Sequence, residues 1–566
     1  MEEKMVVRSN VYFDSVTLMS VSQRAQRLEG IDAVMIGMGT PLNLDLLGTL
    51  GFKTSVEAGP NDLIFALRGA GAQVIDAAMA QAEELLSKGL RKAAGDRGRG
   101  PARSLAQALE RQPSSNLALI SVPGAYAARE ARKALEAGWH VMLFSDNVAV
   151  EEEVSLKRSA HQKGLLLMGP DCGTAIINGV PLAFANVVRK GAIGIVGASG
   201  TGTQEVCVQI DRLGQGVSQV IGTGGRDLSR AVGGIMMLDG IEALKQDSET
   251  KVIVVVSKPA APEVAEKVHA ALRWCGKPAV YCLIGAERRT GAGSGTGAGS
   301  RMGAGRETPE DSQVKSAGNL LEAARLAVEA AGGQFAETGD APEVADTPGA
   351  GLPGASLPAT VGEAVQEAIK GLKNGQRYLR GLFSGGTLGD EAMAILAPEL
   401  GTIHSNVPLA AEGQLSDPAR SFKHTVLDLG DDRFTAGRPH PMIDLSLRIA
   451  RLLGEARDPE VAVILLDVVL GYGSHPDPAS ELVPAIRKAR EIAAGEGRNL
   501  VFAAYVCGTD QDPQGYQAQV AAFRQVGVAV FPSNVEAAEF AGAVARARAM
   551  AMADGALAAG SAEGGD

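Results

Sequence analysis

The chain has 566 residues, of which 45% are hydrophobic, and its formal net charge is −11. This length allows roughly three or four domains with ordinary cores, and the acidic charge argues against nucleic acid or an acidic membrane as a partner. No apolar run reaches the ~18 residues of a membrane span, the N-terminus lacks a signal-peptide core, and the five cysteines form no Cys-x-x-Cys pair. The sequence therefore predicts a cytoplasmic protein with neither a disulfide framework nor a metal site.

Alternating strand and helix patterns in residues 1–95 predict a small α/β sandwich. Strands are expected at residues 5–13, 33–37 and 63–67, and helices at 20–28 and 73–86. After a basic connector, a parallel βαβ run is expected, with strands at residues 116–123, 140–144 and 165–168.

The same alternation continues to the C-terminal region, with strands expected at residues 193–196, 217–221, 252–256, 279–283, 462–466, 501–504 and 528–531. Continuous apolar strands such as 252–256 indicate parallel sheets with both faces covered. Ligands of such sheets bind at the carboxyl ends of the strands. Residues 286–309 are of low complexity and 332–358 are rich in Gly, Pro and Ala, which predicts a mobile insert and an interdomain linker.

Two glycine-rich turns follow apolar strands and lead into helices, one in each half of the chain. Small residues let a ligand approach the backbone, and the free N–H groups and dipole of a helix start attract an anion. A single turn of this kind is common, but two of them indicate a duplicated unit around phosphate. The residues expected to bind phosphate are Ser199, Gly200, Thr201, Gly202, Thr203, Ser384, Gly385, Gly386 and Thr387.

Other strand-end loops carry polar candidates. Cys172 either performs chemistry or is an inert buried thiol, while Thr174 in the same loop is expected near the anion. Arg226 lies either in a site wall or in a surface loop. Asp428 and Asp510 are expected to contact substrate, and the spacing of Asp510 and Asp512 is too general to predict a metal. Cys172, Thr174, Arg226 and Asp510 each follow a predicted strand.

The densest polar stretch is residues 427–444, where Pro439 and Pro441 fix the backbone around His440. His440 is expected to act as an acid–base group or anion ligand, with Arg438 and Asp444 as further catalytic candidates. The alternative is a helix-entry loop in which Asp444 is the N-cap. We favour function, because so many polar groups in a rigid loop serve no packing purpose.

The order of these motifs resembles succinyl-CoA synthetase and its acyl-CoA synthetase relatives. Residues 121–124 and 169–172 look like that family's CoA-binding domain, residues 191–204 like its first phosphate-gripping helix start, and residues 381–392 like the ligase domain of the partner subunit. Gly-Pro-Asp-Cys-Gly-Thr at 169–174 and Gly-Arg-Pro-His-Pro-Met-Ile-Asp at 437–444 resemble the FdrA family more closely, over nearly the whole chain.

This resemblance implies an α/β protein of several domains. They are a small N-terminal α/β domain (1–95), a CoA-binding-like Rossmann-type domain (104–188), a first flavodoxin-like ligase-type domain (189–331, with the insert 286–309), a linker (332–375) and a second ligase-type domain (376–552). Three features of the synthetases lack a counterpart, namely the phosphorylated histidine, the ATP-grasp domain and the N-terminal glycine loop for CoA. No histidine lies between His269 and His404. These gaps argue against the use of ATP and CoA, and no cofactor is assigned.

The FdrA family is associated with anaerobic purine and allantoin breakdown and with an oxamate carbamoyltransferase made of several different subunits. The resemblance therefore implies a transferase subunit at which phosphate attacks an activated carbamoyl or acyl carbon and gives carbamoyl phosphate. Its partners would be a small-molecule substrate and other protein subunits, in a homo- or hetero-oligomer. Two alternatives stay open: an ADP-forming acyl-CoA ligase completed by partner subunits, and a non-catalytic scaffold that senses an anion.

Overall fold

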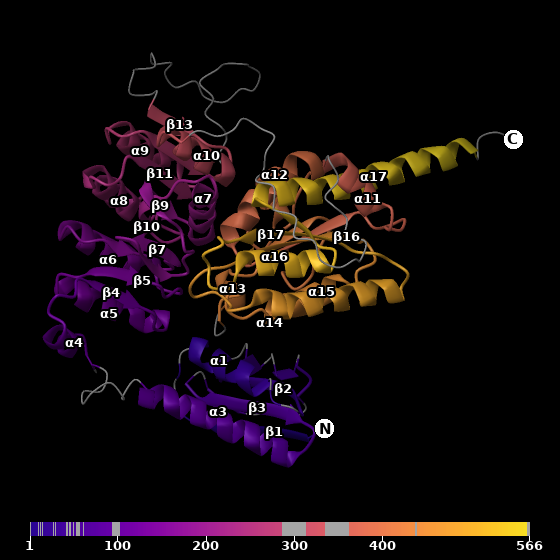
Figure 1. The fold of residues 1–566 in the computed structure, drawn as a ribbon, viewed down its shortest axis with the longest axis horizontal. Helices are drawn as coiled ribbons and strands as arrows, with labels where there is room; N and C mark the ends of the chain where they lie inside the picture. The colour runs from indigo at the N-terminus through magenta and orange to yellow at the C-terminus, as the bar shows by residue number, and fades with distance from the viewer. Residues whose placement is uncertain are drawn as a thin grey trace. The chain divides into compact units, whose positions relative to one another are not determined.

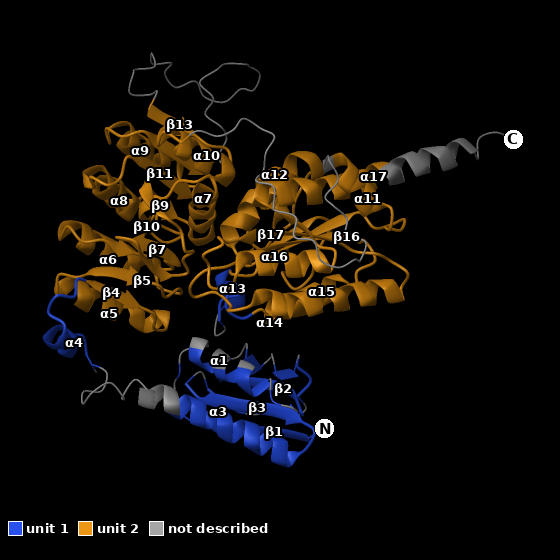
Figure 2. Cartoon of the chain, in the orientation of Figure 1, with its two compact units in different colours: residues 1–116, 431–444 blue, residues 117–430, 445–566 orange. Residues whose placement is uncertain are grey.

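The computed structural model describes residues 2–92 except 10, 12, 14, 27, 29, 41, 42, 45, 46, 49, 53–56 and 60, and then residues 102, 104–285, 313–333, 361–435 and 439–562. The chain divides into two compact units: residues 1–116 with 431–444 form unit 1, and residues 117–430 with 445–566 form unit 2 (Figure 2). The predicted insert at 286–309 and residues 334–360 of the predicted linker lie outside the described residues, whereas residues 361–369, also predicted as linker, form a helix. No described helix is long and apolar enough to cross a membrane.

Unit 1 is built on a three-stranded antiparallel sheet with the order β1-β3-β2. Its elements are β1 (Glu2–Arg8), α1 (Ser15–Gln26), β2 (Ile31–Met38), β3 (Leu63–Gly69), α3 (Ala72–Lys92), α4 (Leu105–Arg111) and α13 (Asp432–Thr435). Side chains of β3 alternate between two cores, because successive residues of a strand face opposite sides. Leu63 and Phe65 pack in one core with Leu18 of α1, whereas Ile64 packs in the other with Phe52.

The first part of unit 2 contains two sheets (Figure 1). A three-stranded parallel sheet has the order β4-β5-β6, as predicted, and a seven-stranded sheet has the order β13-β12-β11-β9-β10-β7-β8. The hairpin of β7 and β8 is antiparallel and precedes the boundary predicted at 188/189, yet β7 pairs with β10 beyond it. Helices α7 and α10 pack against each other and the larger sheet, as do α8 and α9.

The elements of this part are β4 (Leu117–Ile120), α5 (Gly124–Glu136), β5 (His140–Leu143), α6 (Val150–Gln162), β6 (Leu167–Met168), β7 (Thr174–Ile177), β8 (Val180–Ala183), β9 (Lys190–Ala198), α7 (Gly200–Arg212), β10 (Val217–Gly222), α8 (Ile235–Gln246), β11 (Val252–Ser257), α9 (Pro262–Arg273), β12 (Ala279–Leu283), β13 (Val314–Ser316) and α10 (Leu320–Ala330).

The second part of unit 2 is a five-stranded, fully parallel sheet with the order β15-β14-β16-β17-β18. Helices α11, α12 and α17 pack together on it, and α14, α15 and α16 form a second group. All nine residues of β16 are buried, which is typical of a parallel sheet covered on both faces. The α/β fold class with parallel sheets that the sequence predicted is confirmed.

Its elements are α11 (Val361–Ile369), β14 (Tyr378–Phe383), α12 (Gly386–Leu400), the 3-10 helix Ala411–Gly413, β15 (Thr425–Asp428), α14 (Ser446–Glu455), β16 (Val461–Val469), α15 (Pro478–Gly495), β17 (Val501–Cys507), α16 (Tyr516–Gln525), β18 (Ala529–Phe531) and α17 (Asn534–Ala562).

Helix α7 lies between the two doubly wound parts of unit 2, because it contacts β9 and β10 on one side and α12 and β17 on the other. Every residue from Thr201 to Asp211 is consequently buried. A helix with one exposed face would turn its polar residues to water. Here Gln209 instead donates to the carbonyl of Pro532, and Arg212 donates to the carbonyls of Val506 and Gly508.

Candidate functional site

The starts of α7 and α12 meet in the structure, although 186 residues separate Gly200 from Gly386 in the sequence. Ser199, the N-cap of α7, accepts a hydrogen bond from the N–H of Gly202 at 3.0 Å. Its hydroxyl donates to Oγ1 of Thr387, in the first turn of α12, at 2.7 Å. The two glycine turns, one from each half of the chain, are therefore brought together. We refer to residues 199–202 and 384–387 as the paired helix starts; their binding of phosphate stays a prediction.

Small residues are what allow this contact. A Cβ on Gly202 would lie 2.7 Å from Cγ2 of Thr387, and a Cβ on Gly385 would lie 2.7 Å from Oγ1 of Thr201. Either methyl group would force the helices apart. Only the first helical residues, Gly200 and Gly386, are partly exposed, so a ligand would approach there.

A buried carboxylate holds the second turn in place. Asp467 of β16 accepts hydrogen bonds from the N–H and the hydroxyl of Ser384 and from the N–H of Gly385, at 2.8, 2.9 and 2.8 Å. Arg448 of α14 donates to the same carboxylate at 2.7 Å. Sequence reasoning missed Asp467, although a single acid inside a nine-residue apolar strand was a visible signal.

Three ionisable side chains surround the first residue of α12. Asp428, a predicted substrate ligand, ends β15, and its Oδ2 would clash with a Cβ on Gly386. Lys258, which follows β11, places its Nζ 3.8 Å from the carboxylates of both Asp428 and Asp390. Burial raises the pKa of Asp390, while Lys258 opposes this shift. Neither Lys258 nor Asp390 was singled out from the sequence.

The first residue of α7 lies next to a neutral hydroxyl group, that of Thr174, and not, among the described residues, next to ionisable side chains. Thr174 begins β7, is 3% exposed, and its Oγ1 has no hydrogen-bond partner among the described residues. This oxygen lies 3.8 Å from the place a Cβ would take on Gly200. The structure thus places Thr174 beside the first glycine turn, and its contact with an anion stays a prediction.

Cys172 and Thr203 have structural surroundings. The Cys172 thiol is buried and lies 3.6 Å from the carbonyl of Thr174, and burial raises its pKa to about 12. Because the thiolate is the nucleophile, a thiol that stays protonated at neutral pH argues against the catalytic role considered for Cys172. The hydroxyl of Thr203 donates back to the carbonyl of Ser199, inside its own turn.

Arg226 and Asp510 also have partners away from the paired helix starts. Arg226 donates to the carbonyl of Val148 and pairs with Glu153 of α6 at 3.0 Å. Asp510 is exposed and accepts from Gln517 at 3.0 Å. Their roles as substrate ligands remain predictions.

Asp512 ties two parts of unit 2 together, because its carboxylate accepts from the side chain of Asn186 and the N–H groups of Val187 and Thr509. It is therefore engaged in hydrogen bonds and not paired with Asp510 around an ion. Within the described ranges, no group of three or more His, Cys, Asp or Glu side chains is arranged for a metal.

The catalytic candidates of residues 431–444 belong to unit 1, and the paired helix starts belong to unit 2. Arg438 lies outside the described residues. Nδ1 of His440 accepts from the N–H of Met442, and burial lowers its pKa to about 4, so the ring is neutral at pH ~7. A neutral ring can exchange a hydrogen bond but brings no charge to an anion. The role of His440 stays a prediction.

The alternative interpretation of Asp444 as an N-cap is wrong. Helix α14 begins at Ser446, its N-cap is Leu445, and no side chain caps it. Asp444 instead donates its N–H to the carbonyl of His440 at 3.0 Å.

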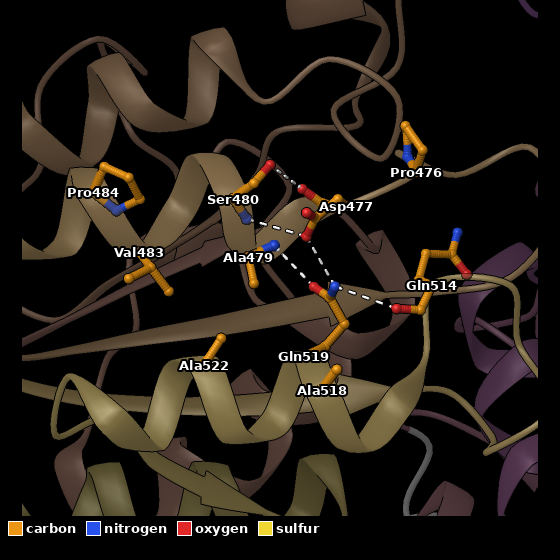
Figure 3. A pocket seen from close by; sticks show the side chains of 10 residues that line it. All are labelled: Pro476, Asp477, Ala479, Ser480, Val483, Pro484, Gln514, Ala518, Gln519 and Ala522. Carbon is orange, nitrogen blue, oxygen red and sulfur yellow. Dashed lines mark hydrogen bonds between the residues drawn. The ribbon is translucent and has the colours of Figure 1, made fainter.

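An open hollow of about 520 Å³ between α15 and α16 is not the site that the sequence predicted (Figure 3). Its polar groups bond one another. Gln519 accepts from the N–H of Ala479 and donates to Asp477, which caps α15 through the N–H of Ser480 (Figure 3). This hollow therefore serves the helix ends around it.

A pair of buried carboxylates lies behind the paired helix starts. Glu205 of α7 and Glu391 of α12 each follow their N-cap by six positions, and they are 0% and 1% exposed. Burial and then repulsion by Glu205 raise the pKa of Glu391 to about 7, and burial also raises the pKa of Glu205. Glu391 accepts from the N–H of Leu320 and from Asn534.

Comparison with known proteins agrees with this architecture. The CoA-ligase family model matches residues 382–544, the CoA-binding domain model residues 188–282, and the model named "AllF, heavy metal-associated domain" residues 1–101. The CoA-binding match thus falls on the segment predicted as the first ligase-type domain. Residues 1–101 contain neither Cys nor His, so they offer no thiolate or imidazole ligand, and methionine thioethers are the soft ligands that they contain.

The chain is 44% identical over 541 residues to the uncharacterized protein YahF of Escherichia coli K12. The aligned region covers 94% of this chain and 97% of YahF. It is 30% identical to an alpha subunit of ADP-forming succinate–CoA ligase from Archaeoglobus fulgidus, over 26% of this chain and 52% of that subunit. A solved acetyl-CoA synthetase of Ca. Korarchaeum cryptofilum aligns at 17% identity with a TM-score of 0.26, over 78% of this chain and 85% of its own.

The fold and these matches define a succinyl-CoA-synthetase-like protein of the acyl-CoA ligase class, with an AllF-type domain at its N-terminus. The chain belongs to the FdrA family, which it shares with YahF.

The buried acid pair makes stability depend on pH. The folded-state pKa of Glu391, about 7, lies above the ordinary value of 4.5, so the folded state holds the proton more tightly. The free energy of unfolding should therefore fall as pH rises from 4.5 to about 7 and stay low above it. Glu391→Gln should remove the contribution of Glu391 to this dependence, which corresponds to a relative gain in the free energy of unfolding at pH ~8 on the order of 3 kcal/mol.

Urea unfolding of wild type and variant at pH ~5 and ~8 measures this difference. Glu399→Gln is the matched control, because Glu399 lies on the same helix with 45% of its side chain exposed. Parallel pH profiles for wild type and Glu391→Gln would contradict the prediction.

Proposed function

We propose that this chain is the subunit of a multi-subunit transferase at which phosphate attacks a carbamoyl carbon and carbamoyl phosphate is formed. The observation that supports the proposal most is the meeting of two helix starts through Ser199 and Thr387 at 2.7 Å. Each helix start carries about half a unit of positive charge and free N–H groups. No side chain caps α12, so its first N–H groups are available to an anion.

The reaction would balance as follows for a carbamoyl donor such as oxalurate. A phosphate oxygen forms a bond to the carbamoyl carbon, the bond from that carbon to the nitrogen of oxamate breaks, and this nitrogen takes up a proton. The donors of the paired helix starts would stabilise the negative charge that develops on the carbamoyl oxygen and on the phosphoryl group.

Direct attack by phosphate also fits the distribution of histidines. The synthetases pass a phosphoryl group through a histidine, whereas this chain has none between His269 and His404. Phosphate bound at the paired helix starts would then itself be the nucleophile. The proposal assigns no role to CoA or to a nucleotide.

The second candidate is an ADP-forming acyl-CoA ligase completed by partner subunits, which the 30% identity to a ligase alpha subunit favours. Acid-labile phosphate on the isolated chain after incubation with labelled ATP would support the ligase, and we expect none. Tight phosphate binding without any turnover would instead indicate an anion-sensing scaffold.

The direct test is a phosphate-dependent assay of the chain co-purified with its partner subunits. With oxalurate and phosphate, we expect carbamoyl phosphate and oxamate in equal amounts. Formation of oxamate at the same rate without phosphate would overturn the proposal.

Thr387→Val should weaken phosphate binding by about tenfold, because it removes the hydrogen bond that joins the two helix starts. Valine keeps the volume of the side chain, so the fold should persist. Calorimetric titration of the full chain with phosphate gives the dissociation constant. Thr402→Val, at an exposed position, is the control and should bind like wild type.

His440→Ala should lower turnover by about 10²-fold or more if this residue transfers a proton. Arg438→Lys should chiefly weaken substrate binding, because lysine cannot form two parallel hydrogen bonds to a carboxylate or phosphate. Steady-state kinetics of the reconstituted complex measure both effects, with His161→Ala on the exposed face of α6 as control. Wild-type kinetics in both variants would show that neither His440 nor Arg438 has a catalytic or binding role.

A further inference from the structure

The two helix starts differ in the chemistry of their surroundings. Beside Gly200 lie hydroxyl groups, those of Ser199, Thr201 and Thr174. Beside Gly386 lie the ammonium group of Lys258 and the carboxylates of Asp428 and Asp390. A duplicated unit built for phosphate alone would have no reason for this difference.

The hydroxyl side suits a phosphate. Thr174 Oγ1 is buried, has no hydrogen-bond partner among the described residues, and lies next to the first residue of α7. A buried hydroxyl without a partner is costly unless a ligand completes it. This observation is independent of the helix start and indicates that a ligand with acceptor oxygens sits here.

The charged side suits a different part of the substrate. A carboxylate only accepts hydrogen bonds, so Asp428 would repel a phosphate oxygen and attract an N–H group. Lys258 is 32% exposed on its side chain and lies 3.8 Å from Asp428. The acceptor Asp428 could bind an amide N–H group, and the cation Lys258 beside it could bind a neighbouring carboxylate of the same ligand.

We propose that Asp428 and Lys258 are the residues that determine donor specificity at this site. Asp428 accepts a hydrogen bond from the carbamoyl nitrogen, and Lys258 pairs with the carboxylate of the donor. This inference rests on the proposed function. It names the side chains that discriminate between a carbamoyl donor and an acyl donor. Phosphate then lies at the start of α7, next to Thr174.

The site should therefore strongly prefer a donor that carries NH₂ on the reacting carbon to one that carries CH₃ there. A site built to bond an N–H group rejects an analogue that lacks it by about 10⁴-fold or more in kcat/KM. Carbamoyl and acetyl groups differ only by NH₂ against CH₃, so shape alone would separate them poorly. The acceptor at Asp428 supplies the difference.

Two stable phosphonates test this point by equilibrium binding to the full chain. Phosphonoacetamide carries the NH₂ group, and acetonylphosphonate carries CH₃ in its place. Wild type should bind phosphonoacetamide about 10²-fold more tightly or better. Asp428→Val should abolish this preference and Asp428→Asn should reduce it about tenfold, both with an unchanged dissociation constant for inorganic phosphate.

Lys258→Met should weaken the binding of oxamate by about tenfold or more, because the carboxylate loses its cation. Asp417→Asn and Lys251→Met are the matched controls, both at exposed positions, and should bind all probes like wild type. Asp428→Asn retains a side-chain acceptor for the N–H of Gly430, so at least one Asp428 variant keeps the local fold.

The outcomes separate this inference from the proposed function. If wild type binds inorganic phosphate but binds the two phosphonates equally, the assignment of Asp428 is wrong and the phosphate site stands. If Lys258→Met binds oxamate like wild type, the assignment of Lys258 is wrong. If wild type binds neither phosphate nor the phosphonates, the proposed function fails, and this inference fails with it.

Discussion

The contact between the starts of α7 and α12 is the constraint on which the rest of unit 2 depends. Two helix starts repel each other, because each carries about half a positive charge. The structure offsets this repulsion with acceptors at close range. Asp467 accepts three hydrogen bonds from the turn before α12, and Asp428 lies against Gly386. A bound anion would add to the same balance.

Burial of these carboxylates is itself unfavourable, and two different arrangements reduce this penalty. Asp467 is fully buried but pairs with Arg448, which is 1% exposed and also donates to the carbonyl of Leu382. Breaking such a pair leaves an uncompensated charge in the interior. Glu205 and Glu391 face each other's charge instead, and burial with repulsion leaves Glu391 with a pKa of about 7. The Asp467–Arg448 pair is therefore held by opposite charges, whereas the Glu205–Glu391 pair takes up a proton near neutral pH.

Other buried polar residues join the parts of unit 2 to one another. Asp512 binds Asn186 and Val187 across more than 300 residues of sequence, and Arg212 donates to the carbonyl of Gly508, which follows β17. The buried Lys157 joins Glu153 of α6 to Asp227 at 2.8 Å in each case. Polar contacts at these joints fix orientation, because each buried group must find its one partner.

Local patterns determined the strands and helices, the parallel class of the sheets and the position of both glycine turns. A continuous apolar run such as residues 252–256 favours a buried strand, and small residues before a helix mark a turn whose backbone can be approached closely. The Asn178-Gly179 hairpin was missed, although Asn-Gly between apolar runs is a turn signal and both residues have positive φ. Tertiary structure alone decided that Ser199 meets Thr387, that Lys258 lies beside Asp428 and Asp390, and that Glu205 faces Glu391. The physical reason is that these pairs join elements far apart in the chain, and no local pattern encodes which buried polar groups will share one interior.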